Sequence, residues 1–129
     1  MPKRRILVVD DHPDSAESLV LLLRIKGHEV ALAHDGPAAL EQFERELPEL
    51  ALLDIGLPGL DGFEVARRVR AMDPGRKCKL VALTGYGGDR ERRLAREAGF
   101  DEHLVKPVAF DTLLAIVESL DSSSGDGIA

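Results

Sequence analysis

Residues 51–62 read ALLDIGLPGLDG, a run of apolar residues that ends in an acid and passes into a turn rich in proline and glycine. A short apolar run closed by turn residues is typical of a strand buried on both faces, as strands of parallel sheets are. The acid, Asp54, stands at the C-terminal end of this strand. Taken alone it fits a turn former, a metal ligand or a nucleophile, and the rest of the chain has to distinguish these roles.

The same kind of apolar run recurs along the chain and alternates with longer amphipathic segments. Five runs predict strands, at residues 5–10, 29–34, 50–54, 79–84 and 102–106. Five segments predict helices, at residues 14–26, 37–47, 62–72, 89–98 and 110–120, and several of them stop at a glycine or shortly before a proline. Strands that alternate with helices need right-handed crossovers. The pattern therefore predicts a three-layer α/β domain whose parallel sheet is covered on both faces.

Length and composition limit the class of protein. The 129 residues fit one domain, and 44% apolar with 31% charged residues is typical of a globular chain. No segment reaches the roughly 20 apolar residues of a membrane span, and the N-terminus lacks the pattern of an export signal. The single cysteine excludes an internal disulfide. With a net charge of −6, these features predict a cytoplasmic protein that binds neither nucleic acid nor a membrane.

Two local segments complete the outline of the domain. The cluster Arg67, Arg68 and Arg70 predicts one solvated face of a helix. The residues after Leu120 read DSSSGDGIA and are polar. We therefore expect a folded domain over residues 1–121 and a disordered tail, or the start of a linker, over residues 122–129.

Polar residues stand at the C-terminal ends of four of the five predicted strands. They are Asp10 and Asp11, Asp54, Thr84 and Lys106. In a parallel sheet these ends share one edge, where ligands bind in this fold class. Each residue alone has an ordinary interpretation as a helix cap, a turn residue or a surface charge. Together those interpretations leave three carboxylates crowded, although a pair about 5 Å apart repels by roughly 3 kcal/mol at an effective dielectric of 20.

A bound divalent cation would relieve this repulsion. Oxygen ligands favour Mg²⁺, for which Mn²⁺ can substitute. With the ion held by Asp11 and Asp54, the Asp54 carboxylate could attack a phosphoryl group whose charge is masked and whose geometry is fixed. Lys106 and the Thr84 hydroxyl could contact other phosphoryl oxygens. The predicted product is an aspartyl phosphate at Asp54, a high-energy species that water can later hydrolyse.

The motifs that carry this chemistry resemble those of response-regulator receiver domains. They are the DD pair at 10–11, DIGLPGLDG from 54, LTGYG from 83 and LVKP from 104, in this order, and the resemblance covers about residues 6–120. It implies a flavodoxin-like (βα)5 fold with strand order 2-1-3-4-5. It also implies that Asp54 accepts a phosphoryl group from a phosphohistidine on a partner, which would be a histidine kinase or a histidine phosphotransfer protein.

The resemblance also assigns roles around Asp54. It implies that Asp11 binds the metal directly and that Asp10 binds it through water. The backbone carbonyl of Gly56 would be the third protein ligand. The Lys106–Pro107 peptide bond is expected to be cis, which a proline makes affordable at a sharp turn.

The resemblance implies a switch that changes the far face of the domain. In the family a threonine, here Thr84, moves toward the phosphate while an aromatic residue three positions before the lysine turns inward. That position is His103 in this chain, a departure from the Phe or Tyr of the family. Tyr86 stands where the family tunes the access of water to the acyl phosphate, and we expect it to shield the site.

The first predicted helix offers an indication about partners. Its core-facing stripe consists of Ala16, Leu19, Leu22 and Leu23. Leu21 and Ile25 fall largely outside this stripe. In receivers this helix docks the helical bundle of the kinase, so we predict that Leu21 and Ile25 contribute to the docking surface. The stretch GFDEHLVKPV most resembles receivers attached to hybrid histidine kinases, and the downstream target has no signature in the sequence.

Other functions found on similar folds fit the residues less well. A flavodoxin-like electron carrier needs a phosphate-binding loop rich in Ser and Thr after the first strand, where this chain has DDHPD. A phosphatase of the haloacid dehalogenase type needs a second acid two residues after its nucleophile, and Asp10-Asp11-His12 lacks this spacing. A pseudo-receiver usually lacks one of the site residues, all of which this chain has. The prediction is therefore a signalling switch that catalyses its own phosphorylation and dephosphorylation.

Overall fold

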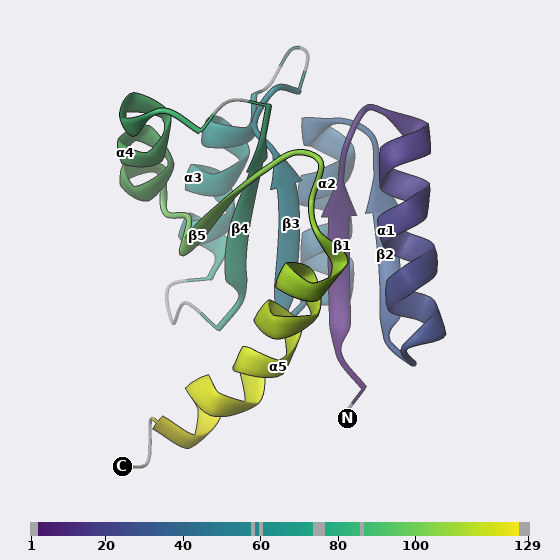
Figure 1. Ribbon diagram of the computed structural model, residues 1–129. Coiled ribbons are helices and arrows are strands. Elements are labelled where there is room, and N and C mark those ends of the chain that lie inside the picture. The colour runs from purple at the N-terminus through teal and green to yellow at the C-terminus, as the bar shows by residue number, and fades with distance from the viewer. Residues whose placement is uncertain (1–2, 58, 60, 74–76, 86, 127–129) are drawn as a thin grey trace.

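A sheet of five parallel strands forms the centre of the fold, in the order β2-β1-β3-β4-β5 (Figure 1). The strands are β1 (Arg5–Val9), β2 (Glu29–Ala33), β3 (Leu50–Asp54), β4 (Lys79–Thr84) and β5 (Glu102–Val105). The computed structural model describes residues 3–57, 59, 61–73, 77–85 and 87–126, and for residues 13, 15 and 121–126 it describes the backbone alone. The strand order confirms the predicted flavodoxin-like topology.

Five helices cover the two faces of the sheet and make the three predicted layers. They are α1 (Pro13–Ile25), α2 (Gly36–Glu46), α3 (Gly62–Met72), α4 (Asp89–Ala98) and α5 (Phe110–Asp126). Helices α1 and α5 pack on one face, while α2, α3 and α4 pack on the other (Figure 1). None of the helices in the described part of the chain is long and apolar enough to cross a membrane.

Strand alternation divides the core into two clusters, one on each side of the sheet. Along β1, Ile6 and Val8 face the cluster that includes α1 and α5, whereas Leu7 and Val9 face the cluster that includes α2, α3 and α4. Strands β1, β3 and β4 are buried on both faces, as the apolar runs predict. For the edge strands the prediction is wrong, since most residues of β2 and β5 are only half-buried. An edge strand has a neighbour on one side only, so water reaches part of its surface.

Aspartate side chains fix the N-terminal ends of two of the helices. Asp35 and Asp61 cap α2 and α3, because their carboxylates accept hydrogen bonds from backbone N–H groups three residues later, at 2.8 and 2.9 Å. Helix α5 corrects the predicted helix end at residue 120, since it continues to Asp126. Extending an existing helix adds one hydrogen bond for each residue that is fixed, and serine opposes this only weakly. The domain boundary at residue 121 stays a prediction.

Arg70 corrects the interpretation of the arginine cluster on α3. Only 11% of its side chain is exposed, and its guanidinium donates to Gly99 O at 2.9 Å, Cys78 O at 2.7 Å and Asp101 Oδ2 at 2.7 Å. A β-carbon at Gly99 would come within 2.7 Å of Arg70 Cγ, and the φ of +110° there also favours glycine. Arg70 therefore ties α3 to the starts of β4 and β5, while the exposed Arg67 fits the predicted solvated face.

Candidate functional site

The C-terminal edge of the sheet brings together the polar residues that the sequence predicts there. Asp10 follows β1, Asp54 ends β3, Thr84 ends β4 and Lys106 follows β5. A hydrogen bond of 2.7 Å from Lys106 N to Thr84 O continues the pairing one residue beyond β5. Asp10, Asp54 and Thr84 are each no more than 5% exposed. The hydrophobic core beneath the edge therefore fixes where these side chains begin.

Lys106 joins two of the carboxylates. Its Nζ donates to Asp54 Oδ2 at 2.8 Å and to Asp10 Oδ2 at 3.2 Å. Burial of the ammonium favours its neutral form, but the hydrogen bonds and negative charges of Asp54 and Asp10 outweigh burial and raise the pKa of Lys106. Lys106 is therefore a fixed positive charge beside the Asp54 carboxylate at neutral pH.

The second oxygen of Asp54 is held by the backbone of the following turn. Gly56 N donates to Asp54 Oδ1 at 2.8 Å. A β-carbon at position 56 would make an ordinary contact of 3.4 Å with that oxygen, so the site does not need a glycine there. With Lys106 on one oxygen and Gly56 N–H on the other, the orientation of the carboxylate is set. The predicted role of the Gly56 carbonyl as a metal ligand stays a prediction.

A histidine to which the sequence analysis gives no role completes the acidic cluster. His12 Nδ1 lies 3.1 Å from Asp11 Oδ1, 3.3 Å from Asp10 Oδ1 and 4.0 Å from Asp54 Oδ2. The backbone N–H of His12 also donates to Asp10 Oδ1 at 2.9 Å. The signal that could have found His12 is its position directly after the acidic pair, which puts its side chain at the same strand end.

These four side chains have the donor atoms and spacing of a divalent-metal site. One ligand atom from each of Asp10, Asp11, His12 and Asp54 lies within 4.8 Å of the other three. Asp11 Oδ1 is buried and accepts no hydrogen bond from the residues that the structure describes. A buried carboxylate oxygen that accepts no hydrogen bond is suited to binding a cation. The cluster could therefore bind a metal, as the sequence predicts.

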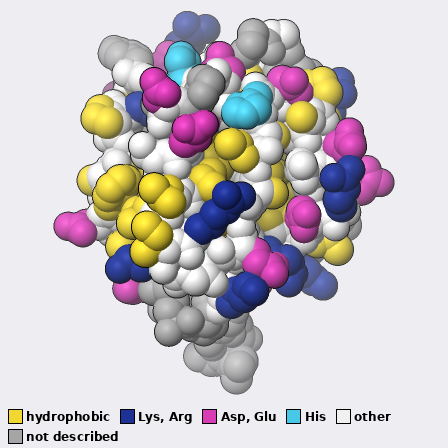
Figure 2. Space-filling view, turned by 90° about the vertical axis from the view of Figure 1, so that its right-hand side faces the viewer, with side chains coloured by type: hydrophobic (Ala, Val, Ile, Leu, Met, Phe, Trp, Pro, Cys, Tyr) yellow, Lys and Arg dark blue, Asp and Glu magenta, His cyan; other side chains and the backbone are white. Residues whose placement is uncertain are grey.

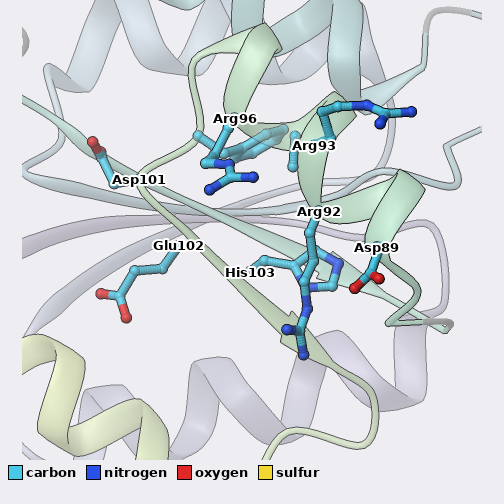
Figure 3. A pocket seen from close by; sticks show the side chains of 9 residues that line it. Asp89, Arg92, Arg93, Arg96, Asp101, Glu102 and His103 are labelled. Atoms are coloured by element: carbon cyan, nitrogen blue, oxygen red, sulfur yellow. The ribbon is translucent and has the colours of Figure 1, made fainter.

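The predicted switch residues are not all brought together. Thr84 lies at the acidic cluster, but His103 lines a hollow of about 540 Å³ between α4 and β5, where Figure 3 shows it with Arg92 and Asp89. Burial, reinforced by the charge of Arg92 and opposed by that of Glu91, lowers the pKa of His103. Its Nε2 is buried without a hydrogen-bond partner among the described residues. Tyr86 lies outside the described residues.

A second hollow opens beside Lys106, on the α1 side of the sheet edge. It measures about 280 Å³, and Asp10, Lys106, Pro107 and Phe110 are among the residues that line it. The Lys106–Pro107 peptide bond is cis, which confirms the conformation that the family resemblance implies. Phe110 is 47% exposed at this hollow. Sequence reasoning missed Phe110, because an exposed aromatic residue at a helix start has no distinctive pattern.

The two apolar residues predicted to dock a partner are exposed on α1. Leu21 is 60% exposed and Ile25 is 71% exposed. Figure 2 looks at the α1 side of the molecule and shows hydrophobic side chains gathered on this face, with acidic and histidine side chains toward the edge where the strands end. The exposure confirms that these side chains lie outside the core, and their role in docking stays a prediction.

The fold and this edge define a doubly wound α/β domain with an acidic, lysine-bearing pocket at the strand ends. The family model for the response regulator receiver domain matches residues 6–118. The chain therefore belongs to the response regulator receiver family, as the motifs predict, and is a receiver domain of a two-component response regulator.

Relatives of known sequence agree with this membership. The chain is 40% identical over 113 residues to a 14.6 kDa protein from the sodA1 3′ region of Leptolyngbya boryana, covering 88% of this chain and 86% of that protein. It is 39% identical to the response regulator MprA of Mycobacterium ulcerans, covering 97% of this chain and 56% of MprA. The chain thus spans about half the length of MprA.

Solved structures show the same fold. A CheY-like receiver domain protein from Methanospirillum hungatei superposes with a TM-score of 0.86 at 33% identity, covering 97% of this chain and 99% of that one. The receiver domain of the sensor histidine kinase PA1611 from Pseudomonas aeruginosa superposes with a TM-score of 0.83 at 32% identity, covering 92% and 98%. That structure contains a magnesium ion coordinated in its active site cleft.

Proposed function

We propose that this receiver domain accepts a phosphoryl group on Asp54 from a phosphohistidine on a partner protein. The observation that carries the proposal is the position of the Asp54 carboxylate. It is 5% exposed at the strand ends, held by Lys106 Nζ and by Gly56 N–H, and grouped with two further carboxylates. The direction of this carboxylate is therefore fixed. It lies at the end of β3, where a phosphoryl group can approach it from outside the sheet.

The cofactor that we propose is Mg²⁺, with Mn²⁺ as a substitute. Asp10, Asp11 and Asp54 would hold the ion, Asp10 through water, and the Gly56 carbonyl would add a backbone ligand. The buried Asp11 Oδ1 without a hydrogen bond supports this assignment, as does the magnesium ion in the PA1611 receiver domain. When bound, the ion offsets the negative charge of the phosphoryl oxygens, so that a carboxylate can approach phosphorus.

The transfer itself needs little from the protein beyond position and charge. One oxygen of Asp54 forms a bond to phosphorus while the bond from phosphorus to the imidazole nitrogen of the partner breaks, and the electron pair of that bond leaves with the imidazole. Lys106 and the Thr84 hydroxyl stabilise charge on the phosphoryl oxygens. Water later cleaves the acyl phosphate and regenerates Asp54. The domain is thus a switch that assists its own phosphorylation and dephosphorylation.

The partner that donates the phosphoryl group is a histidine kinase or a histidine phosphotransfer protein. The exposed pair Leu21 and Ile25 lies in the second half of α1, and the hollow that contains Phe110 opens beside Lys106. Together they offer this partner apolar contacts along the α1 side of the domain. Replacing both α1 residues by Glu should slow transfer from the phosphohistidine donor and leave phosphorylation by acetyl phosphate unchanged. Met72→Glu, which changes an exposed apolar residue on α3, is the matched control.

Phosphorylation would change the far face of the domain through the end of β4. Thr84 is next to the site, so its hydroxyl can follow the phosphoryl group. His103 would respond in place of the family's aromatic residue, and Tyr86 would shield the acyl phosphate from water. The neutral form of His103, favoured by burial and by Arg92, supports a role based on its ring shape rather than on its charge.

The test of the proposed function is incubation with acetyl phosphate and Mg²⁺, followed by the intact mass of the protein. We expect one added phosphoryl group in the wild-type chain, none without Mg²⁺, and none in Asp54→Asn. Glu49→Gln, which changes an acid at the opposite edge of the sheet, should be phosphorylated like the wild type. A phosphorylated Asp54→Asn variant would contradict the proposal.

A further inference from the structure

We propose that His12 is a metal ligand and that it shifts the preference of this site toward transition-metal dications such as Mn²⁺ and Co²⁺. The inference rests on the proposed function only because it concerns the same metal site. His12 adds a nitrogen donor to a set of ligands that otherwise consists of oxygens. The consequence is a ratio of affinities for Mn²⁺ and Mg²⁺ that depends on one exposed side chain.

The spacing between His12 and the carboxylates is that of ligands around one ion. At metal–ligand distances of about 2.1 Å, neighbouring ligands of an octahedral ion are about 3.0 Å apart and opposite ligands about 4.2 Å apart. His12 Nδ1 lies 3.1 and 3.3 Å from oxygens of Asp11 and Asp10, and 4.0 Å from Asp54 Oδ2. The distances to Asp11 and Asp54 are those expected for ligands that share one ion, while Asp10, which would act through water, needs no such spacing.

Among the described residues, the ring of His12 makes no polar contact outside the acidic cluster. His12 is the N-cap residue of α1, but its side chain makes no capping hydrogen bond. The ring is 69% exposed, and its described polar contacts are with the carboxylates of the cluster. The backbone N–H, in contrast, is bonded to Asp10 Oδ1 and fixes where the side chain starts. A neutral imidazole could therefore exchange its contact with Asp10 for a bond to the ion.

The donor atoms of this cluster suit different metals to different degrees. Mg²⁺ prefers oxygen ligands and keeps several waters, so an imidazole adds little to its binding. Imidazole nitrogen suits the first-row transition metals, whose affinity for nitrogen donors rises from Mn²⁺ through Co²⁺. Three carboxylates with one imidazole nitrogen thus bind Mg²⁺ through oxygen alone and transition metals through oxygen and nitrogen.

The chain contains a matched control histidine. His34 is exposed and lies beside the same site, where its Nδ1 is 3.1 Å from the backbone oxygen of Asp10. It is not one of the four residues whose ligand atoms lie together. His34→Ala therefore removes a neighbouring imidazole without removing a proposed ligand.

The experiment is calorimetric titration of the full chain with Mg²⁺, Mn²⁺ and Co²⁺ at one pH where imidazole is neutral. We expect His12→Ala to weaken Mn²⁺ and Co²⁺ binding at least about tenfold, since even outer-sphere partners of a metal contribute that much. Mg²⁺ binding should change by less than about threefold, because its ligands are oxygens. The visible spectrum of bound Co²⁺ should shift in His12→Ala and stay unchanged in His34→Ala.

A measurement on the wild-type chain avoids any effect of substitution on folding. Bound Mn²⁺ should broaden the NMR signals of the His12 ring far more than those of the His34 ring. An unchanged ratio of Mn²⁺ to Mg²⁺ affinity in His12→Ala, with an unchanged Co²⁺ spectrum, would overturn the inference. Phosphorylation with Mg²⁺ tests the proposed function separately, so a failure of one is distinguishable from a failure of the other.

Discussion

Acidic residues lie both at the edge of the sheet where the strands begin and at the edge where the strands end. Their negative charge is balanced by cations at the first edge and is in excess at the second. At the edge where the strands begin, the acids are paired with cations, and Arg70 is shared by Asp73 and Asp101. Glu49 pairs with Arg4 at 2.7 Å, and Glu102 pairs with Lys79 at 2.7 Å. Asp101, just before β5, pairs with Arg70 at 2.7 Å. This edge is closed, because its charges satisfy one another within the domain.

At the edge where the strands end, three carboxylates share two nitrogen-bearing side chains. Lys106 forms ion pairs with both Asp10 and Asp54, and His12 lies among all three acids. An arrangement with surplus negative charge is costly to stability, so it indicates a site that binds a cation. The comparison teaches that charge balance, rather than the presence of charged residues, separates the functional edge from the structural one.

The largest effect should come from breaking the closed edge at Arg70. We expect Arg70→Ala to lower the free energy of unfolding by about 3 kcal/mol, because it removes the cation paired with Asp101 and the donor to two backbone carbonyls. Urea unfolding measures this loss. Arg67→Ala, which removes an exposed arginine of the same helix, should leave the midpoint nearly unchanged. Equal midpoints for the two variants would show that the closed edge is not held by Arg70.

A smaller effect of opposite sign should follow from neutralising an acid at the open edge. Asp54→Asn removes the repulsion between Asp54 and the two other carboxylates, which lie within 4.8 Å of it. At an effective dielectric of 20, each of these repulsions is worth about 3.5 kcal/mol or more. The lost attraction to Lys106 at 2.8 Å is roughly 6 kcal/mol on the same scale. We therefore expect the metal-free variant to be more stable than the wild type by about 1 kcal/mol.

Asp101→Asn is the matched control for this variant, since it neutralises an acid whose charge is balanced. It should lower the urea midpoint, whereas Asp54→Asn raises it. Millimolar Mg²⁺ should raise the melting temperature of the wild type and of Asp101→Asn, but much less that of Asp54→Asn. If both substitutions destabilised the metal-free protein, the two edges would not differ in charge balance.

The smallest effect concerns pH and sharpens the description of the closed edge. Burial lowers the pKa of His28 below the usual 6.5. The positive charge of Arg4 adds to this effect, and the negative charge of Glu49 opposes it. As the pH falls through about 6.5, the unfolded chain binds a proton that the folded chain does not, so stability decreases. His28→Asn keeps an acceptor for the Arg4 N–H and should flatten this decrease. His103, whose pKa is also lowered, would cause part of the slope that is left.

Urea unfolding at a series of pH values measures this difference. His34→Asn is the control, because His34 is exposed. A wild-type slope that stays the same in His28→Asn would contradict the burial of a neutral imidazole at the closed edge.

Much of the fold could be predicted because its elements are marked by short-range signals. Strands β3 and β4 and helices α3 and α4 begin and end where the sequence predicts, since apolar runs, Asp61 at the start of α3 and Gly99 after α4 mark those ends. The edge strands and the end of α5 were less predictable. The burial of a strand depends on its neighbours in the sheet, which a local pattern does not specify.

In the site, too, the residues at the strand ends could be predicted from local patterns, whereas contacts that depend on side-chain direction could not. The strand ends predicted the meeting of Asp10, Asp54, Thr84 and Lys106, because parallel strands share an edge. The position of His12 over the carboxylates depends on a side-chain direction that no periodicity encodes. The burial of Arg70 was hidden for a related reason, since its partners come from segments 8 to 31 residues away.

The most direct test of the account is to locate the phosphoryl group after reaction with acetyl phosphate and Mg²⁺. Borohydride reduces an aspartyl phosphate to homoserine, which marks the modified residue for peptide mass mapping. We expect homoserine at position 54 and at no other aspartate, in the wild type and in Glu49→Gln alike. Homoserine at position 10 or 11, or none at position 54 in protein that has gained a phosphoryl group, would contradict the assignment of Asp54 as the nucleophile.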